Sequence, residues 1–162
     1  MAKNQAPLLT RNEISEGIRQ AERSDRRRFP KLLHKPGDYF NAVFNFIMCD
    51  SYMQPHLHPG NEKIEHIYIV EGRVAALFFD DKGYIKQCTI LESGGIELIV
   101  VPAFKWHTYV MLSDHAVTYE TMIGVYKPET WKRFANWAPK EGTQESIEYR
   151  GLLQQKAETW CS

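Results

Sequence analysis

The sequence predicts a single, mostly-β domain with a short helix before the strands and a helical segment after them. Residues 40–126 hold runs rich in valine, isoleucine, tyrosine and phenylalanine, separated by turn residues. A helix-capping pattern stands at residues 10–13, and 162 residues suffice for one stable core but are few for two. Many short strands at this spacing are typical of a sandwich or a barrel.

Composition and charge narrow the class of partner. Lysine plus arginine equals aspartate plus glutamate at 20 each, so no net charge draws the protein to nucleic acid or to an anionic membrane. No apolar run reaches membrane-spanning length, and the first residues lack the apolar core of a secretory signal. We therefore expect a cytoplasmic protein with a small-molecule ligand.

Cys49, Cys88 and Cys161 are widely spaced and are expected to be reduced.

Three parts of one domain are expected along the chain. In residues 1–39, Thr10 and Glu13 form a capping box, and the helix that follows runs to about Ala21 and lies on the barrel. Residues 127–162 form a helical segment in which Glu129–Trp137 is a short helix and 143–162 either packs as a helix or frays. The barrel itself, 40–126, has strands expected near 40–49, 64–72, 73–80, 84–91, 96–101, 105–112 and 115–125.

Two histidines one residue apart raise the question of a metal site. In an extended segment His56 and His58 point to the same face, about 6.5 to 7 Å apart along the backbone. Such a pair alone is more typical of surface loop histidines. Glu65 opens a strand whose inward positions are otherwise apolar, and an unpaired carboxylate there is costly to desolvate. With His107 early in another strand, a divalent cation would pair with all four groups.

These residues resemble the two metal-binding motifs of the cupins. The resemblance rests on His56-x-His58, on Glu65 and Gly72 with six residues between them, and on Pro102 and His107 with four residues between them. It implies a single cupin barrel, also called a double-stranded β-helix or jelly roll. It also implies His56, His58, Glu65 and His107 as metal ligands.

The sequence differs from the cupin motifs at several positions. Six residues separate His58 from Glu65 where cupins have three or four, so Glu62 competes with Glu65 as the carboxylate ligand. We prefer Glu65, because two extra residues are easier to accommodate in the preceding Pro-Gly-Asn loop than inside a strand. Phe104 stands where the second motif has glycine, and Met111 replaces the usual asparagine.

A narrower resemblance covers roughly residues 18–142. It is similar to the WbuC-type cupin-fold metalloproteins, and it is carried by residues 21–28, 55–59, 120–126 and 134–141, the last reading Phe-Ala-Asn-Trp-Ala-Pro-Lys-Glu. This resemblance implies a function in bacterial surface-polysaccharide biosynthesis without a defined reaction.

Three imidazoles and one carboxylate suit Fe(II), Mn(II), Ni(II) or Zn(II), and the sequence does not choose among them. The first hypothesis is a metal-dependent enzyme acting on a carbohydrate-related or other small polar metabolite, by isomerase/epimerase-type or dioxygenase chemistry. The alternatives are a non-catalytic cupin that binds or senses a small ligand, and a purely structural metal site in a homodimer.

The remaining candidates surround the proposed ion. Trp106 and Tyr109 flank His107 and offer aromatic faces to a ligand, although each alone is more typical of core packing. Arg26 and Arg28 belong to a basic run that suits an anionic ligand. Glu120, in the last long strand, is the candidate general acid or base, provided that the pleat turns it inward. We also expect a homodimer.

Overall fold

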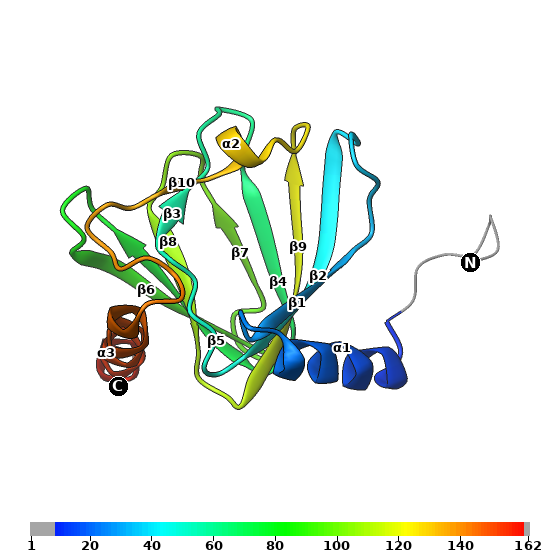
Figure 1. The fold of residues 1–162 in the computed structure, drawn as a ribbon, viewed down its shortest axis with the longest axis horizontal. Helices are drawn as coiled ribbons and strands as arrows, with labels where there is room; N and C mark the ends of the chain where they lie inside the picture. The colour runs from blue at the N-terminus through cyan, green and yellow to red at the C-terminus, as the bar shows by residue number, and fades with distance from the viewer. Residues whose placement is uncertain (1–8, 161–162) are drawn as a thin grey trace.

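The computed structural model describes residues 9–160 and, in that range, places ten strands in two five-stranded antiparallel sheets (Figure 1). The first sheet has the order β1 (Arg28–Leu32), β2 (Phe40–Met48), β9 (His115–Ile123), β4 (Glu65–Glu71), β7 (Leu98–Val101). The second has the order β10 (Arg133–Phe134), β3 (His56–Leu57), β8 (His107–Met111), β5 (Arg73–Phe79), β6 (Ile85–Glu92). The expected mostly-β architecture, with a helix at each end, is confirmed.

The predicted strands all form, but the segment after them differs from the prediction. The helix expected over Glu129–Trp137 is wrong: α2 (Pro128–Trp131) is one short turn, and the chain then extends into β10. In β10, Arg133 pairs with Leu57 and Phe134 pairs with His56. Tertiary pairing with β3 therefore outweighs the local helical preference of this segment.

Helix α1 (Arg11–Arg23) begins as the sequence predicts. The Thr10 backbone N–H donates to the Glu13 carboxylate at 2.8 Å, and the Glu13 N–H donates to Thr10 Oγ1 at 3.2 Å, which completes a capping box. The helix packs on β1 and β2 (Figure 1) through a stripe that includes Gly17. A Cβ added at Gly17 would lie 2.5 Å from the Phe46 ring, so glycine permits this close approach.

Helix α3 (Gln144–Trp160) shows that the C-terminal tail packs rather than frays. It lies outside the second sheet (Figure 1), where Leu153 and Ala157 are buried against the outward side chains of β5 and β8, such as Leu77 and Val110. Cys88 packs at the edge of the same cluster, and Cys161 lies outside the described residues.

The space between the two sheets is part core and part cavity. Ile67 and Ile69 of β4, Phe78 of β5 and Met111 of β8 meet there in a buried apolar cluster. Gly72 closes the tight β4–β5 connection with φ +89°, and a Cβ there would lie 2.4 Å from the His115 carbonyl oxygen. Glu65 lies two residues before Ile67 and lines the cavity, so the polar site begins where the core ends.

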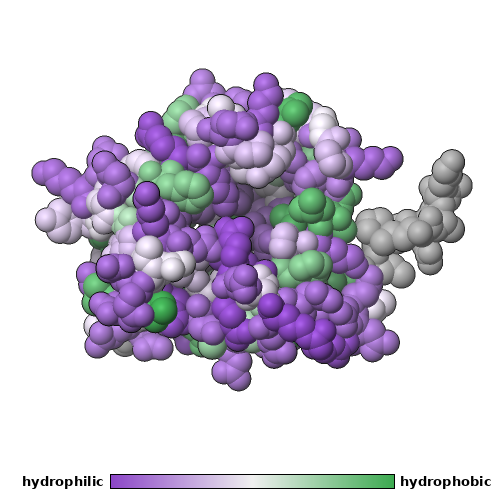
Figure 2. Space-filling view, in the orientation of Figure 1, coloured by the Kyte–Doolittle hydropathy of each residue, from purple (hydrophilic) through white to green (hydrophobic). Residues whose placement is uncertain are grey.

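The surface of the face shown in Figure 2 is mostly hydrophilic, with hydrophobic side chains in small separate groups. Within the described part of the chain, no helix combines the length and the apolar character needed to cross a bilayer.

Candidate metal centre

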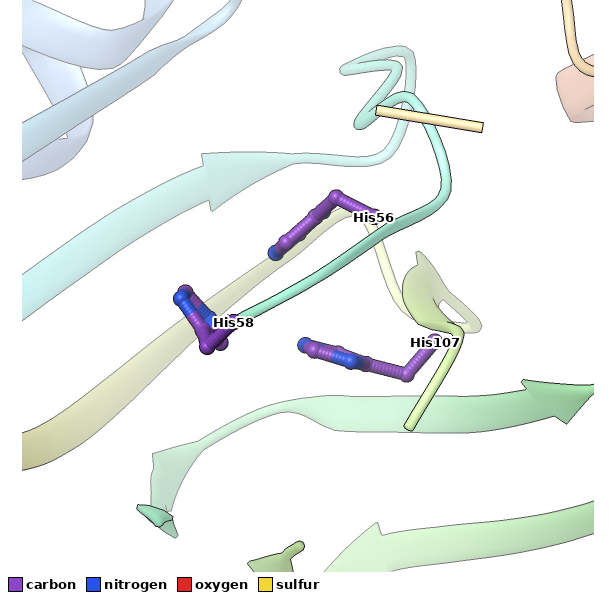
Figure 3. A group of neighbouring side chains, drawn as sticks. All are labelled: His56, His58 and His107. Carbon is purple, nitrogen blue, oxygen red and sulfur yellow. The ribbon is translucent and has the colours of Figure 1, made fainter. Parts of the chain in front are cut away.

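Three histidine rings converge between the sheets (Figure 3). His56 is the first residue of β3, His58 directly follows β3, and His107 begins β8, where it pairs with His56 across the sheet. One ring nitrogen from each lies within 4.8 Å of the others, and all three side chains are at most 2% exposed. The same-face placement predicted for His56 and His58 therefore holds.

Backbone carbonyl groups fix the orientation of each ring. The Nδ1 atoms of the three histidines bond to backbone oxygens: His56 to Gln54 at 2.9 Å, His58 to Trp131 at 2.8 Å and His107 to Lys105 at 2.8 Å. Because a carbonyl oxygen only accepts, each Nδ1 carries the proton and donates it. Each Nε2 is then left to present a lone pair, and among residues 9–160 none of the three has a hydrogen-bond partner.

Glu65 completes the cluster from the opposite sheet. Its Oε2 lies 3.4 Å from His58 Nε2 and 3.3 Å from His107 Nε2. Burial raises the pKa of Glu65, but hydrogen bonding and charge interaction with His107 and His58, which require a proton on Nε2, outweigh burial and hold the pKa well below its usual value. Where these nitrogens present lone pairs instead, a bound cation is needed in place of that proton. Glu65 is therefore a buried carboxylate anion facing two ring nitrogens. The competing candidate, Glu62, lies on the exposed loop before β4.

The donor set fits a first-row divalent ion. Three buried Nε2 atoms without partners and one buried carboxylate are costly unless a shared cation satisfies them. Burial, with the positive charge of Lys132 and the neighbouring His107, lowers the pKa of His56 well below its ordinary value. A neutral imidazole is the form that binds a metal, so His56 is poised as a ligand.

A cavity of about 910 Å³ opens beside this cluster. His56, Glu65 and Glu120 lie on its wall, and the remainder is lined both by polar and charged side chains and by apolar side chains of β1, β2 and the segment around α2. A volume of this size accommodates a small organic ligand. The cavity therefore places ligand-sized space directly against the polar cluster.

Glu120 faces the cavity from β9, as its candidate role requires. It is directly opposite Ile67 of β4, and it accepts a hydrogen bond from Thr118 Oγ1 at 2.7 Å. Burial and the negative charge of Glu65 raise the pKa of Glu120 to about 7. A carboxyl group with this pKa can both give and take a proton near neutral pH.

Arg26 and Arg28 line the same cavity, but Glu141 already engages both guanidinium groups. Arg26 contacts Glu141 through two hydrogen bonds, at 2.8 and 3.0 Å. Arg28 bonds to Glu141 at 2.9 Å and also donates to Ser51 Oγ and to the Tyr52 carbonyl. The hydrogen bonds to Glu141 connect the start of β1 to the segment before α3. The two guanidinium groups are therefore already engaged and are less available to an anionic ligand.

The two aromatic candidates, Trp106 and Tyr109, lie on opposite sides of the sheet, because alternate residues of an extended chain face opposite sides. Trp106 faces outward, where its Nε1 donates to Asp81 at 2.9 Å and its ring contacts Trp137, so the structure does not bring it to the cavity. Tyr109 faces inward with His107 and is 4% exposed. Its hydroxyl reaches Glu65 rather than offering an open stacking face.

Lys132 is a charged residue of the cavity wall that the sequence did not identify as a candidate site residue. It follows Trp131, whose carbonyl orients His58, and it lies on the cavity wall. Reading the segment as extended rather than helical would have found it, because alternation then turns Lys132 and Phe134 to one side. His34 also lines the cavity, and its Nδ1 contacts the Ala42 carbonyl at 2.9 Å.

The family is shown by comparison of the sequence with known families. The model described as Domain of unknown function (DUF6016) matches residues 9–91, which are 83 of the 162 residues. The chain belongs to this family. The matched region of this DUF6016 protein includes His56, His58 and Glu65, whereas His107 lies beyond it. No curated protein sequence matches the chain significantly.

Solved structures similar to this DUF6016 protein show its fold. CapF, crystallised with the inhibitor 3-isopropenyl-tropolone, matches with a TM-score of 0.57 and 21% identity over 68% of this chain and 32% of CapF. A structure described as DMSP lyases RdDddP and RnDddQII matches at 0.52 and 17%, over 68% of this chain and 53% of that one. Protein SO0799 from Shewanella oneidensis matches at 0.52 and 9%, over 79% and 78%.

The chain thus spans about a third of CapF and about half of the DMSP lyase chain. At these identities the similarity shows the fold alone, and that fold is cupin-like: two antiparallel sheets with the histidine cluster between them.

Proposed function

We propose that this protein is a metal-binding cupin whose ion is held by His56, His58, Glu65 and His107. The observation that carries the proposal is the set of three buried Nε2 atoms, each without a hydrogen-bond partner in the described chain, while each Nδ1 is fixed by a backbone carbonyl. Metal-ligating histidines characteristically donate the other ring N–H in this way. Fe(II), Mn(II), Ni(II) and Zn(II) all suit the donor set.

We further propose that the protein is an enzyme acting on a carbohydrate-related or other small polar metabolite. When bound, such an ion supplies Lewis-acid polarisation or, if it is iron, oxygen chemistry. Beside it, Glu120 holds or accepts the substrate proton at its carboxylate, because its pKa of about 7 matches that task. The cavity of about 910 Å³ next to the histidines supports a substrate of this size.

The resemblance to WbuC-type proteins supports the more specific proposal of a function in surface-polysaccharide biosynthesis. One of the segments that carry it, residues 134–141, lies against the cavity at both ends: Phe134 lines the cavity beside His56, and Glu141 lines it beside Arg28. The reaction expected is of the isomerase/epimerase type or oxygen-dependent.

The test is metal analysis of protein purified without chelator, compared with the double variant His56→Ala/His58→Ala. We expect about one first-row ion per wild-type chain and strong loss of metal from the variant. The matched control is His66→Ala, since His66 lies on β4 next to Glu65 but is exposed on the other face. Equal metal content in all three proteins would contradict the proposal.

Activity on a panel of sugar nucleotides and sugar acids, measured with and without oxygen, then separates the reaction classes. Turnover that survives without oxygen excludes the dioxygenase. Ligand-induced thermal stabilisation without turnover supports a non-catalytic binding cupin instead. If the double variant loses thermal stability rather than turnover, the ion is structural.

A further inference from the structure

The short segment after α2 carries a cation into the cavity. Lys132 has extended backbone angles, φ −132° and ψ 144°, and it leads directly into β10. Alternate residues of an extended chain face opposite sides. Arg133 accordingly faces outward, with its guanidinium 5.3 Å from the centre of the Trp106 ring, whereas Lys132 and Phe134 face the cavity.

The ammonium group of Lys132 has no hydrogen bond or ion pair with any residue in the described range. Burial lowers its pKa, while the charges of Glu65 and Glu120 act in the opposite direction. A half-buried cation that faces a cavity without a direct partner is costly, since burial removes water and no carboxylate of the described residues lies in direct contact with it. Lys132 is therefore a partly buried basic group available to a ligand.

The other basic groups of the cavity are less available. Glu141 holds Arg26 and Arg28 together, and His34 is hydrogen-bonded to Ala42. Arg23 also lines the cavity, but it lies in the last turn of α1 and is exposed to solvent, which weakens its interaction with a ligand. With a divalent ion in place, its two positive charges balance Glu65 and Glu120. The charges of Lys132 and Arg23 then remain, together with one of the two guanidinium charges that Glu141 cannot cancel. The loaded cavity is net positive and favours an anion.

We propose that Lys132 binds an oxyanion, a carboxylate or a phosphate group, of the ligand that occupies this cavity. The proposal rests on the proposed function and names its substrate class: a negatively charged small molecule. Lysine acts as a point charge and suits either group.

Phe134 gives the remainder of such a ligand a contact on the same side of the chain. Its side chain is 53% exposed, and its ring lies 6.1 Å from that of His56. An aromatic face next to a polar centre suits the apolar face of a sugar or of another organic body. A ligand anchored at Lys132 would therefore have an aromatic contact next to the histidine cluster.

The experiment titrates Co²⁺-loaded protein with three probes: glycolate, inorganic phosphate and neutral glucose. Binding is measured as a shift in melting temperature and as a change in the visible absorbance of Co²⁺. We expect one or both anions to bind and glucose to bind far more weakly. The Lys132→Met variant should bind the anion about tenfold less tightly, as expected for a lost hydrogen bond to a charged group.

Two variants separate the charge of Lys132 from its packing. Lys132→Arg should retain anion affinity within about threefold, and so should the outward-facing control Arg133→Met. Co²⁺ affinity should change little in all of them, and circular dichroism checks the fold. Equal anion affinity of Lys132→Met and wild type, tighter binding of glucose than of both anions, or no anion binding at all would overturn the inference.

Failure of the metal proposal gives a different result. Wild-type protein that takes up no Co²⁺ contradicts the proposed function alone. The anion titrations are then repeated on metal-free protein by melting temperature. Stabilisation that depends on Lys132 still supports the oxyanion site, and its absence overturns the site.

Discussion

The hydroxyl of Tyr109 donates a hydrogen bond of 3.1 Å to Glu65 Oε2. The same oxygen faces the Nε2 atoms of His58 and His107. Burial, with the negative charge of Glu65, raises the pKa of Tyr109 well above its usual value, so the phenol keeps its proton and remains a donor at neutral pH. A single tyrosine therefore positions the carboxylate of the proposed metal site.

Replacement Tyr109→Phe should weaken metal binding without unfolding the protein. It removes the hydroxyl that orients Glu65 and leaves the buried ring in place. Loss of a group that orients a ligand typically lowers metal affinity about 10- to 100-fold. Competition with a chromogenic chelator measures the change. The control is Tyr119→Phe, on β9, whose ring packs on Phe44; equal affinities of the two variants would contradict the role of Tyr109.

The two candidate carboxylates make opposite predictions. Glu65→Gln removes the buried negative charge beside His58 and His107, so metal affinity should fall by at least about 100-fold. Glu62→Gln changes an exposed loop residue and should bind metal as wild type does. Isothermal titration with Zn²⁺ distinguishes them. A greater loss in Glu62→Gln than in Glu65→Gln would make Glu62 the ligand.

Strand periodicity accounts for what the sequence could predict about the site. Because inward and outward positions alternate, placing Glu65 on the apolar side of its strand also placed it with the histidines. The same rule, applied to His107, turns Tyr109 inward and Trp106 outward, so the signal that separates these two aromatics was present in the sequence.

The missed features depend on contacts between distant segments. Strand β3 is two residues long and β10 is its equally short partner, so neither gives a periodic signal. Strand β1 contains Pro30 and begins within the basic run, at Arg28, and local propensity does not favour such a sequence as a strand. The pairing of Glu141 with Arg26 and Arg28 joins residues more than 100 positions apart, and nothing local indicates it.

Replacement Glu141→Gln should destabilise the protein by about 1–3 kcal/mol, because it leaves a buried guanidinium without its anion. The Arg28 side chain is 11% exposed and that of Glu141 is 26% exposed. The control is Glu16→Gln, which breaks an exposed pair with Arg19 and should cost much less, because solvent screens that pair. Urea unfolding measures both. A smaller cost for Glu141→Gln than for Glu16→Gln would show that the Arg26–Glu141–Arg28 link does not stabilise the fold.

Two helical glycines provide a test of how α1 packs. Gly17→Ala places a Cβ 2.5 Å from the Phe46 ring, so it should destabilise the protein by about 1–3 kcal/mol despite the better helix propensity of alanine. Gly151→Ala, in α3, meets no described atom within 4 Å and should stabilise by about 0.5–1 kcal/mol. Thermal and urea unfolding give both values. Stabilisation by Gly17→Ala would mean that the helix stands further from β2 than described.

The ion pair between Glu13 of α1 and Lys31 of β1 should be lost in acid. Glu13 accepts a hydrogen bond from Lys31 at 2.6 Å and another from the Thr10 N–H, and these lower its pKa from 4.5 to about 2. A carboxyl whose folded pKa is below its unfolded pKa stabilises the protein fully above the unfolded value, and this stabilisation is lost as the pH falls from about 4.5 towards 2. The difference in unfolding free energy between wild type and Glu13→Gln should therefore be largest near neutral pH and shrink through this range. Glu22→Gln, on the same helix, serves as the control. A difference for Glu13→Gln that stays constant between about pH 6 and pH 2.5 would show that ionised Glu13 does not hold α1 against β1.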